Sequence, residues 1–130
     1  MTALSDYAEN ALLDHLLRRV TFTSPSTWIS LHTGSLLDDG TGAEVSGGGY
    51  VRLQVASGAW DAAAAGATEN SNDIDFGTAT GNWGNILFTG VWDASTAGNL
   101  LLRGELTASK TVNNADGFKI SASNLDISLT

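Results

Sequence analysis

The spacing of apolar and polar positions changes near residue 25, from the period of a helix to the period of β-strands. Within residues 5–19 the apolar positions recur every three or four residues, which is typical of an amphipathic helix. Ser5 or Asp6 can cap its first turn, and Asp6 with Glu9 resembles a capping box. The pattern therefore predicts one N-terminal amphipathic helix.

The predicted helix has a broad apolar face and a polar face. The polar face includes Asp14 and Arg18, whose i, i+4 spacing suits an ion pair. The apolar face can pack on the chain's own sheet, be buried against a neighbouring subunit, or do both. We therefore treat its leucines as a candidate oligomer or attachment interface, namely Leu12, Leu13, Leu16 and Leu17.

After Pro25 apolar and polar residues alternate, as they do in half-buried strands. Residues 56–72 are small and polar and fit a loop or a weak edge segment. Short polar turns between the strands favour antiparallel pairing. The predicted strands are 28–33, 50–55, 73–76, 83–93, 100–106, 118–121 and 125–129.

These elements predict an all-β fold, an antiparallel jelly-roll-like β-sandwich with one N-terminal amphipathic α-helix. We expect residues 1–24 to form the helix and a linker, and residues 25–130 to form a single β-sandwich domain. The strand at 50–55 should place Val51, Leu53 and Val55 on one side. In the strand at 83–93, Ile86, Phe88 and Trp92 should share a face.

Composition narrows the classes of function. The 130 residues carry a net charge of -8 with only six lysines and arginines, so a surface for nucleic acid is disfavoured. The absence of cysteine excludes a disulfide scaffold and a cysteine-ligated zinc site. No apolar run is long enough for a signal peptide or a membrane span, so we expect synthesis in the cytoplasm and no membrane partner.

The residues that could support catalysis are scattered. His15 and His32 lie in different predicted elements, and no nucleophile elbow or phosphate-binding loop is present. Asp73 and Asp75 face one side of a strand, but the rest of a glycosidase site is missing from the pattern. We therefore expect no catalytic residues, no cofactor and no enzyme activity.

The acidic loop before Tyr50 contains Asp38, Asp39 and Glu44. These acids lack the alternation, central glycine and closing glutamate of an EF-hand loop. A solvated loop is favoured over a loop-bound calcium ion, and no metal ligands are assigned.

The tryptophans and Tyr50 allow a second hypothesis about function. Burial in the core or in a subunit contact is the favoured interpretation of these large rings. The alternative is a carbohydrate-binding module, in which exposed rings contact host-surface glycans. Trp60, set among small residues, and Tyr50 are the candidate surface-binding aromatics.

Several segments together resemble a family of small tailed-bacteriophage virion proteins that are described as tail-fibre-like. The resemblance spans nearly the whole chain in order. Trp92 replaces a smaller aromatic, and Gly34 to Leu36 replace a proline-bearing turn. The segments that carry it are LSDYAENALLDHLL, LHT, GTGAEVSGGGYVR, WGNI, GVWDA, GNLLLRGELTASKTVN and residues 118–129.

The resemblance implies a non-enzymatic virion structural protein, assembled in the host cytoplasm, with no catalytic residues to carry over. It is compatible with a tail-fibre-like protein and with a head decoration or vertex protein. Its expected partners are other virion proteins of the capsid or tail. We also expect a homo-oligomer, with a trimer favoured, in which the helix and its flanks attach or trimerise.

Overall fold

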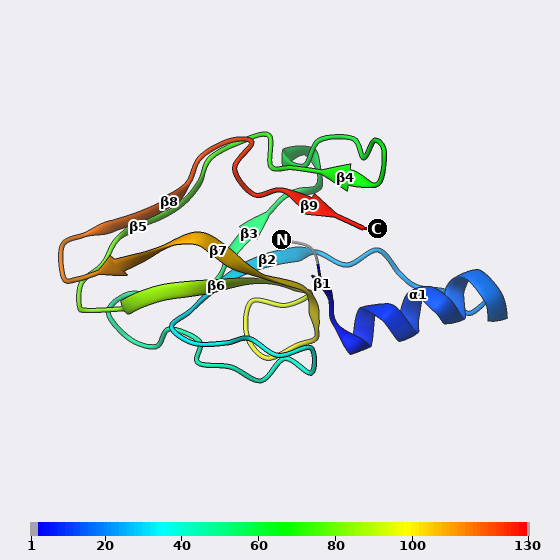
Figure 1. Ribbon diagram of the computed structural model, residues 1–130, viewed down its shortest axis with the longest axis horizontal. Helices are drawn as coiled ribbons and strands as arrows, with labels where there is room; N and C mark the ends of the chain where they lie inside the picture. Colours follow the sequence, from blue (N-terminus) through cyan, green and yellow to red (C-terminus); the bar gives the residue numbers. More distant parts are fainter. Residues whose placement is uncertain (1–2, 130) are drawn as a thin grey trace.

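The computed structural model describes residues 3–129, and its strands form one five-stranded sheet and two two-stranded ribbons (Figure 1). The sheet has the strand order β1-β7-β6-β2-β3, and every pairing is antiparallel. Its strands are β1 (Ala3–Leu4), β2 (Thr27–His32), β3 (Leu53–Val55), β6 (Gly84–Trp92) and β7 (Leu100–Val112). The ribbons pair β4 (Ala67–Thr68) with β9 (Ile127–Ser128), and β5 (Ile74–Thr78) with β8 (Gly117–Ile120).

The main hydrophobic core lies between the sheet and the ribbons. The sheet contributes fully buried side chains such as Ile29, Leu31 and Ile86, and the ribbons contribute Phe118 and Ile127. Two layers of antiparallel strands around one core confirm the predicted all-β, sandwich-like class with one N-terminal helix. The jelly-roll connection and the division at residue 24 stay predictions.

A second, smaller core lies around Trp92, where Leu36 and Leu100 are buried and Phe88 packs against them. The prediction that Ile86 shares a face with Phe88 and Trp92 is wrong, because Ile86 lies in the main core. The cause is a break in the pairing of β6 with β7, whose register shifts between Ile86 and Phe88. A bulge of this kind interrupts the alternation of faces.

The segment at 50–55 begins as a loop and forms a strand only at Leu53. Val51 is 65% exposed whereas Arg52 is buried, so the predicted separation of faces is wrong for its first half. The preceding glycines keep the backbone irregular. Gly48 has φ +59, and a Cβ there would lie 2.9 Å from the carbonyl oxygen of Gly81.

The other strands lie where the pattern predicts them, with different ends. β7 continues six residues beyond 106, and β9 covers only two residues of the predicted 125–129. Within 56–72 the structure has a 3-10 turn, Ser57–Ala59, and the short strand β4, which agrees with a weak edge segment. Strand β1 was not predicted.

Helix α1 spans Asp6–Arg18, one residue shorter at each end than the predicted 5–19, and Ser5 caps it. The Ser5 hydroxyl accepts a hydrogen bond from the backbone N–H of Ala8 at 3.1 Å. The Asp6–Glu9 capping box is therefore wrong, because the cap lies one residue earlier and Ala8 occupies the third helical position. Arg19 ends the helix in the left-handed region with φ 59.

The predicted ion pair between Asp14 and Arg18 is confirmed, with a distance of 3.1 Å.

Within residues 3–129, no helix is long and apolar enough to cross a membrane.

Candidate interaction surface

Helix α1 projects from the sandwich instead of lying on it (Figure 1). Ala8 is its one buried residue. Leu13 is 55% exposed, Leu16 is 73% exposed and Leu17 is 77% exposed, while Leu12 is partly buried. Packing on the chain's own sheet, one of the two alternatives from the sequence, therefore does not account for three of the four leucines.

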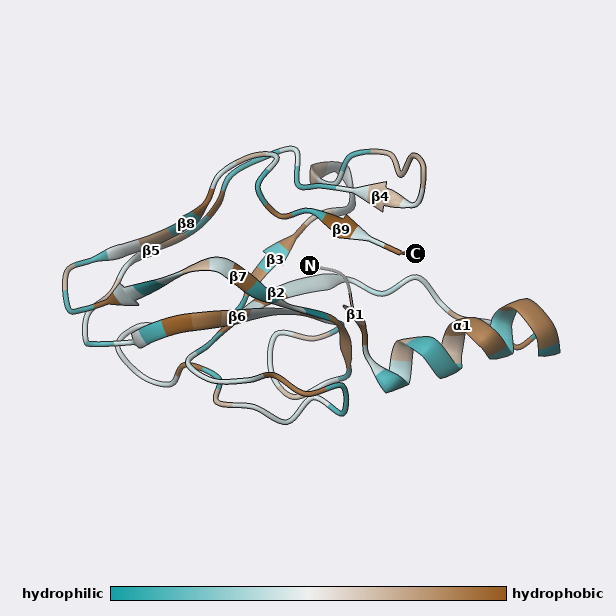
Figure 2. Ribbon diagram, in the orientation of Figure 1, coloured by the Kyte–Doolittle hydropathy of each residue, from teal (hydrophilic) through white to brown (hydrophobic). Residues whose placement is uncertain are grey.

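The segment after the helix covers its opposite side. Phe22 contacts the ring of Tyr7 edge to face, with ring centroids 6.4 Å apart, and His15 Nδ1 lies 3.0 Å from the Val20 carbonyl oxygen. Because successive residues of a helix are rotated by about 100°, Tyr7 and His15 share one side, and Leu13, Leu16 and Leu17 lie on the other. Figure 2 shows the apolar residues along the outer turns of α1. We call Leu12, Leu13, Leu16 and Leu17 the leucine stripe.

The base of the helix, where it leaves the sandwich, is tied to the sheet. Ser5 N–H donates to the Leu101 carbonyl at 3.0 Å, and the Ser5 hydroxyl donates to the carbonyl of Leu100. The backbone N–H of Asp6 donates to the Asp38 carbonyl at 3.2 Å. The acidic loop therefore lies beside the first turn of α1.

This base carries negative charge and one exposed apolar side chain. Asp6, Glu9 and Asp39 are exposed, and Asp38 forms an ion pair with Arg103. Leu37 in the same loop is 53% exposed. We call Asp6, Glu9 and residues 37–39 the acidic base. Sequence reasoning missed this surface, because only the long-range contacts of Ser5 and Asp6 bring the loop to the helix.

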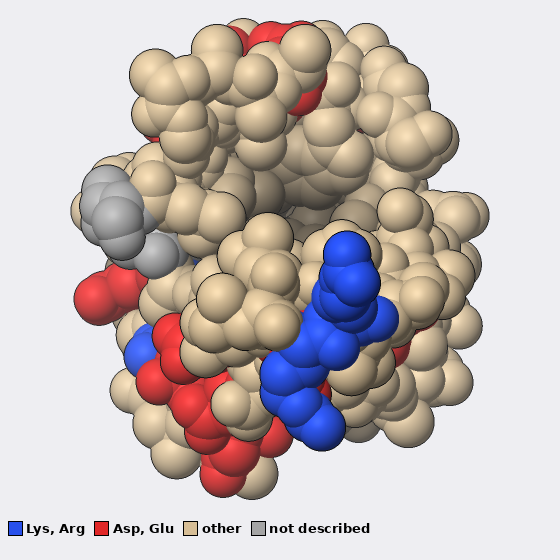
Figure 3. All heavy atoms as spheres, turned by 90° about the vertical axis from the view of Figure 1, so that its right-hand side faces the viewer, with Lys and Arg blue, Asp and Glu red and all other residues tan. Residues whose placement is uncertain are grey.

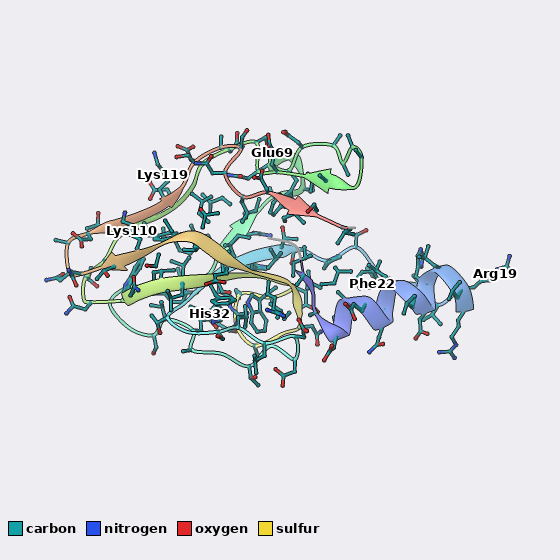
Figure 4. The ribbon with its side chains drawn as sticks, in the orientation of Figure 1. Arg19, Phe22, His32, Glu69, Lys110 and Lys119 are labelled. Atoms are coloured by element: carbon teal, nitrogen blue, oxygen red, sulfur yellow. The ribbon has the colours of Figure 1, made fainter. Side chains whose placement is uncertain are left out.

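The outer end of the helix carries positive charge. Arg18 and Arg19 are both exposed, and the side chain of Arg19 extends away from the sandwich (Figure 4). Figure 3 shows basic and acidic side chains gathered on one face of the molecule. We call Arg18, Arg19 and the neighbouring Val20, which is 45% exposed, the basic tip. The leucine stripe runs between the two charged ends.

The acids around the base have local partners and do not converge on one point. The Asp39 carboxylate accepts hydrogen bonds from the backbone and side chain of Thr41, at 2.9 and 2.7 Å. The Thr41 side chain lowers the pKa of Asp39. Across residues 3–129, no group of three or more histidine, aspartate or glutamate side chains could hold a metal ion.

The two other candidate acids form hydrogen bonds to the backbone at the β5–β8 ribbon. Asp73 accepts a hydrogen bond from the Ala122 N–H at 2.9 Å and lies 3.4 Å from Lys119 Nζ. Asp75 accepts one from the Gly77 N–H at 2.8 Å. Each carboxylate therefore stabilises the backbone beside it.

His32 lies inside the sandwich (Figure 4), where its Nε2 is 2.7 Å from the hydroxyl of Ser30. The hydroxyl also accepts a hydrogen bond from Trp92 Nε1 at 2.8 Å. Ser30 is 0% exposed and His32 is 1% exposed, so this serine–histidine pair is closed to a substrate. Burial, opposed by the charge of Glu44, lowers the pKa of His32 to about 4.

The candidate aromatics are partly buried against the main core. Trp60 Nε1 donates to the Thr27 hydroxyl at 3.0 Å. The Tyr50 hydroxyl donates to Glu44 at 2.9 Å and accepts from the Leu31 N–H at 3.0 Å, and its ring stacks on Phe76. Because both rings have these internal contacts, their placement does not favour a flat platform for sugar rings.

The sequence of residues 3–128 matches a family model described as Podophage GP4 fiber I protein gp80. No curated protein matches the chain. The matched range includes α1 with its leucine stripe and every strand of the sandwich.

Proposed function

The chain belongs to the podophage GP4 fiber I protein family, and on this basis we propose that it is a non-enzymatic structural component of a virion fibre. The family match confirms the resemblance to fibre-like phage virion proteins and extends over nearly the whole chain. Because the family description names a fibre, it supports a fibre position over a head decoration or vertex position. The single observation that carries the proposal is this match over residues 3–128.

The leucine stripe supports a specific mode of attachment. When a partner covers water-exposed apolar surface, the complex is stabilised by about 25 cal/mol for each Å² removed from water. Leu13, Leu16 and Leu17 offer such surface on an element that stands away from the sandwich. The protein therefore assembles through α1 with other virion proteins or with further copies of itself, and the sandwich faces outward.

The position in the particle can be tested on purified virions of a phage that encodes this chain. Mass spectrometry should find the chain in several copies per particle, and antibody labelling in the electron microscope should place it on fibres. Particles that lack the chain would overturn the proposal. Label confined to the head would replace the fibre position with a decoration role.

The attachment surface can be tested in the same particles with two matched variants. Leu16→Ser combined with Leu17→Ser removes the most exposed part of the stripe, whereas Val51→Ser removes an apolar residue of the sandwich that is 65% exposed. We expect the leucine variant to be soluble but depleted from virions, and the Val51 variant to be incorporated normally. Normal incorporation of both variants would exclude the stripe as the attachment surface.

A further inference from the structure

We propose that α1 packs antiparallel against α1 of a second copy of this chain, so that the basic tip of each copy docks on the acidic base of the other. The inference rests on the proposed role of the leucine stripe in assembly and adds the partner and its orientation. It follows from the order of features along one helix, with acids at the base, leucines between and arginines at the tip.

The leucines fit this orientation. The stripe is centred between Leu13 and Leu16, and two antiparallel helices aligned on that centre place Leu16 of one copy against Leu13 of the other. The same alignment places Leu17 against Leu12 of the second copy. Apolar side chains therefore face apolar side chains along the whole stripe, and a two-fold axis repeats every contact.

The charges distinguish this orientation from a parallel one. In the antiparallel pair, the same alignment places Arg19 of one copy opposite Asn10 of the other, one residue from Glu9. Arg19 and Glu9 are both exposed and have no ion-pair partner among the described residues. Parallel helices around a three-fold axis, as in the trimer favoured from the sequence, would instead bring like charges together. Because each copy has a net charge of -8, pairing the basic tip with the acidic base also offsets repulsion between copies.

The sandwich adds surface to the contact. A stable interface buries about 1,200–2,000 Å² in total, more than two short leucine stripes supply. In the antiparallel pair the basic tip of one copy reaches the acidic base of the other. There Val20, which is 45% exposed, and Leu37, which is 53% exposed, provide further apolar area. Both docking ends therefore combine apolar and charged contacts.

A charge-reversal cycle on the full chain tests the orientation. The variants are Glu9→Arg, Arg19→Glu and the double variant, and the measurement is the dissociation constant of the oligomer by sedimentation equilibrium. We expect a mass of twice the 13.5 kDa of one chain. Each single reversal should raise the dissociation constant roughly tenfold, since two pairs per dimer change from attraction to repulsion. The double variant should return to within about threefold of the original value.

Controls separate this inference from the proposed function. Glu105→Arg makes the same charge change on an exposed position of the sandwich and should leave the dissociation constant unchanged. Circular dichroism checks that each variant keeps its helix. A monomer at all concentrations, a mass of three chains, or a double variant weaker than both single variants would overturn the antiparallel pair. The attachment role of the leucines, which is measured in virions, would stand independently of these outcomes.

Discussion

Arg52 and Glu44 form a two-pronged ion pair inside the sandwich, in which Nε and Nη2 of the arginine each lie 2.8 Å from a carboxylate oxygen. The guanidinium also lies 4.0 Å from the centre of the Trp92 ring, and its Nη1 donates to the carbonyls of Ala94 and Ala97. This one side chain joins the acidic loop, β6 and the turn before β7. It is the only buried lysine or arginine among the described residues.

Loss of Arg52 should therefore destabilise the fold strongly. Arg52→Met keeps much of the side-chain volume but leaves the Glu44 carboxylate, which is 28% exposed, without its charge partner. Breaking a largely buried pair costs about 3–5 kcal/mol, so we expect a loss of free energy of unfolding near the lower end of that range. Urea denaturation measures it. Lys119→Met is the matched control, because its pair with Asp73 is about half exposed and should contribute less than about 1 kcal/mol.

The stability of the protein should fall in mild acid because of His32. Its pKa is about 4 in the folded state and about 6.5 when unfolded, so below pH 6.5 the unfolded chain binds more protons than the folded one. The stabilisation is complete above pH 6.5 and is lost as the pH falls toward 4, by up to about 3 kcal/mol. Glu44 and Arg52 are the charged groups that act on this ring. Burial favours a raised pKa for Glu44, but hydrogen bonding by Arg52 outweighs it and the pKa of Glu44 is lowered. Protonation of Glu44 therefore reduces the free energy of unfolding only at lower pH.

Denaturation midpoints measured between pH 7 and 5 check this prediction. His32→Gln should have a lower stability at pH 7 and a flatter pH profile. His15→Gln, which changes an exposed histidine of α1, should keep the profile of the natural chain. An unchanged slope in the His32 variant would assign the acid sensitivity to another group.

Replacement of Ser5 should weaken the attachment of the helix to the sheet. In Ser5→Ala the Ala8 N–H loses its cap and the buried Leu100 carbonyl loses its side-chain donor. Loss of a serine cap costs about 1 kcal/mol, and an unpaired buried polar group adds about 1–3 kcal/mol. We expect a lower free energy of unfolding and faster amide exchange in the first turn of α1. The exposed Ser46→Ala should change neither quantity.

Elements with a strong periodic pattern were predictable from the sequence, and elements set by long-range contacts were not. The positions of α1 and of β2 follow from local spacing to within one residue at each end, because apolar positions such as Ile29 and Leu31 alternate without interruption. The late start of β3 accompanies the irregular backbone of the preceding glycines and the Arg52–Glu44 pair, with Arg52 inward and Val51 outward. No local pattern contains that pair.

The candidate interaction surface was likewise predictable from the sequence only in part. Helical spacing identified the leucine stripe, because a helix must present Leu13, Leu16 and Leu17 on neighbouring positions. Whether the sheet covers them depends on the direction in which α1 leaves β1, which is set by the contacts of Ser5 with β7. The acidic base was unpredictable for the same reason, since Asp38 is far from Asp6 in the sequence and next to it in the fold.

The leucine stripe should separate the stability of the single chain from its association. In Leu16→Ser combined with Leu17→Ser, both altered side chains are more than 70% exposed in the single chain. Because these side chains bury little apolar surface within the single chain, we expect the free energy of unfolding of the monomer to change by less than about 0.5 kcal/mol. Association should fall steeply, because each copy loses apolar surface that only a partner can cover. Light scattering over a range of concentrations measures the association, and urea denaturation of the dilute protein measures the stability.

Leu31→Ala is the reference for a core substitution, because Leu31 is 0% exposed. Its truncation should lower the free energy of unfolding by about 2–5 kcal/mol. A stripe variant that unfolds as readily as Leu31→Ala would mean that the leucines are covered within their own chain in solution. The partner surface would then have to lie elsewhere. A stripe variant that stays stable and no longer associates would instead mean that the helix is stable alone and that its leucines serve the contact between chains.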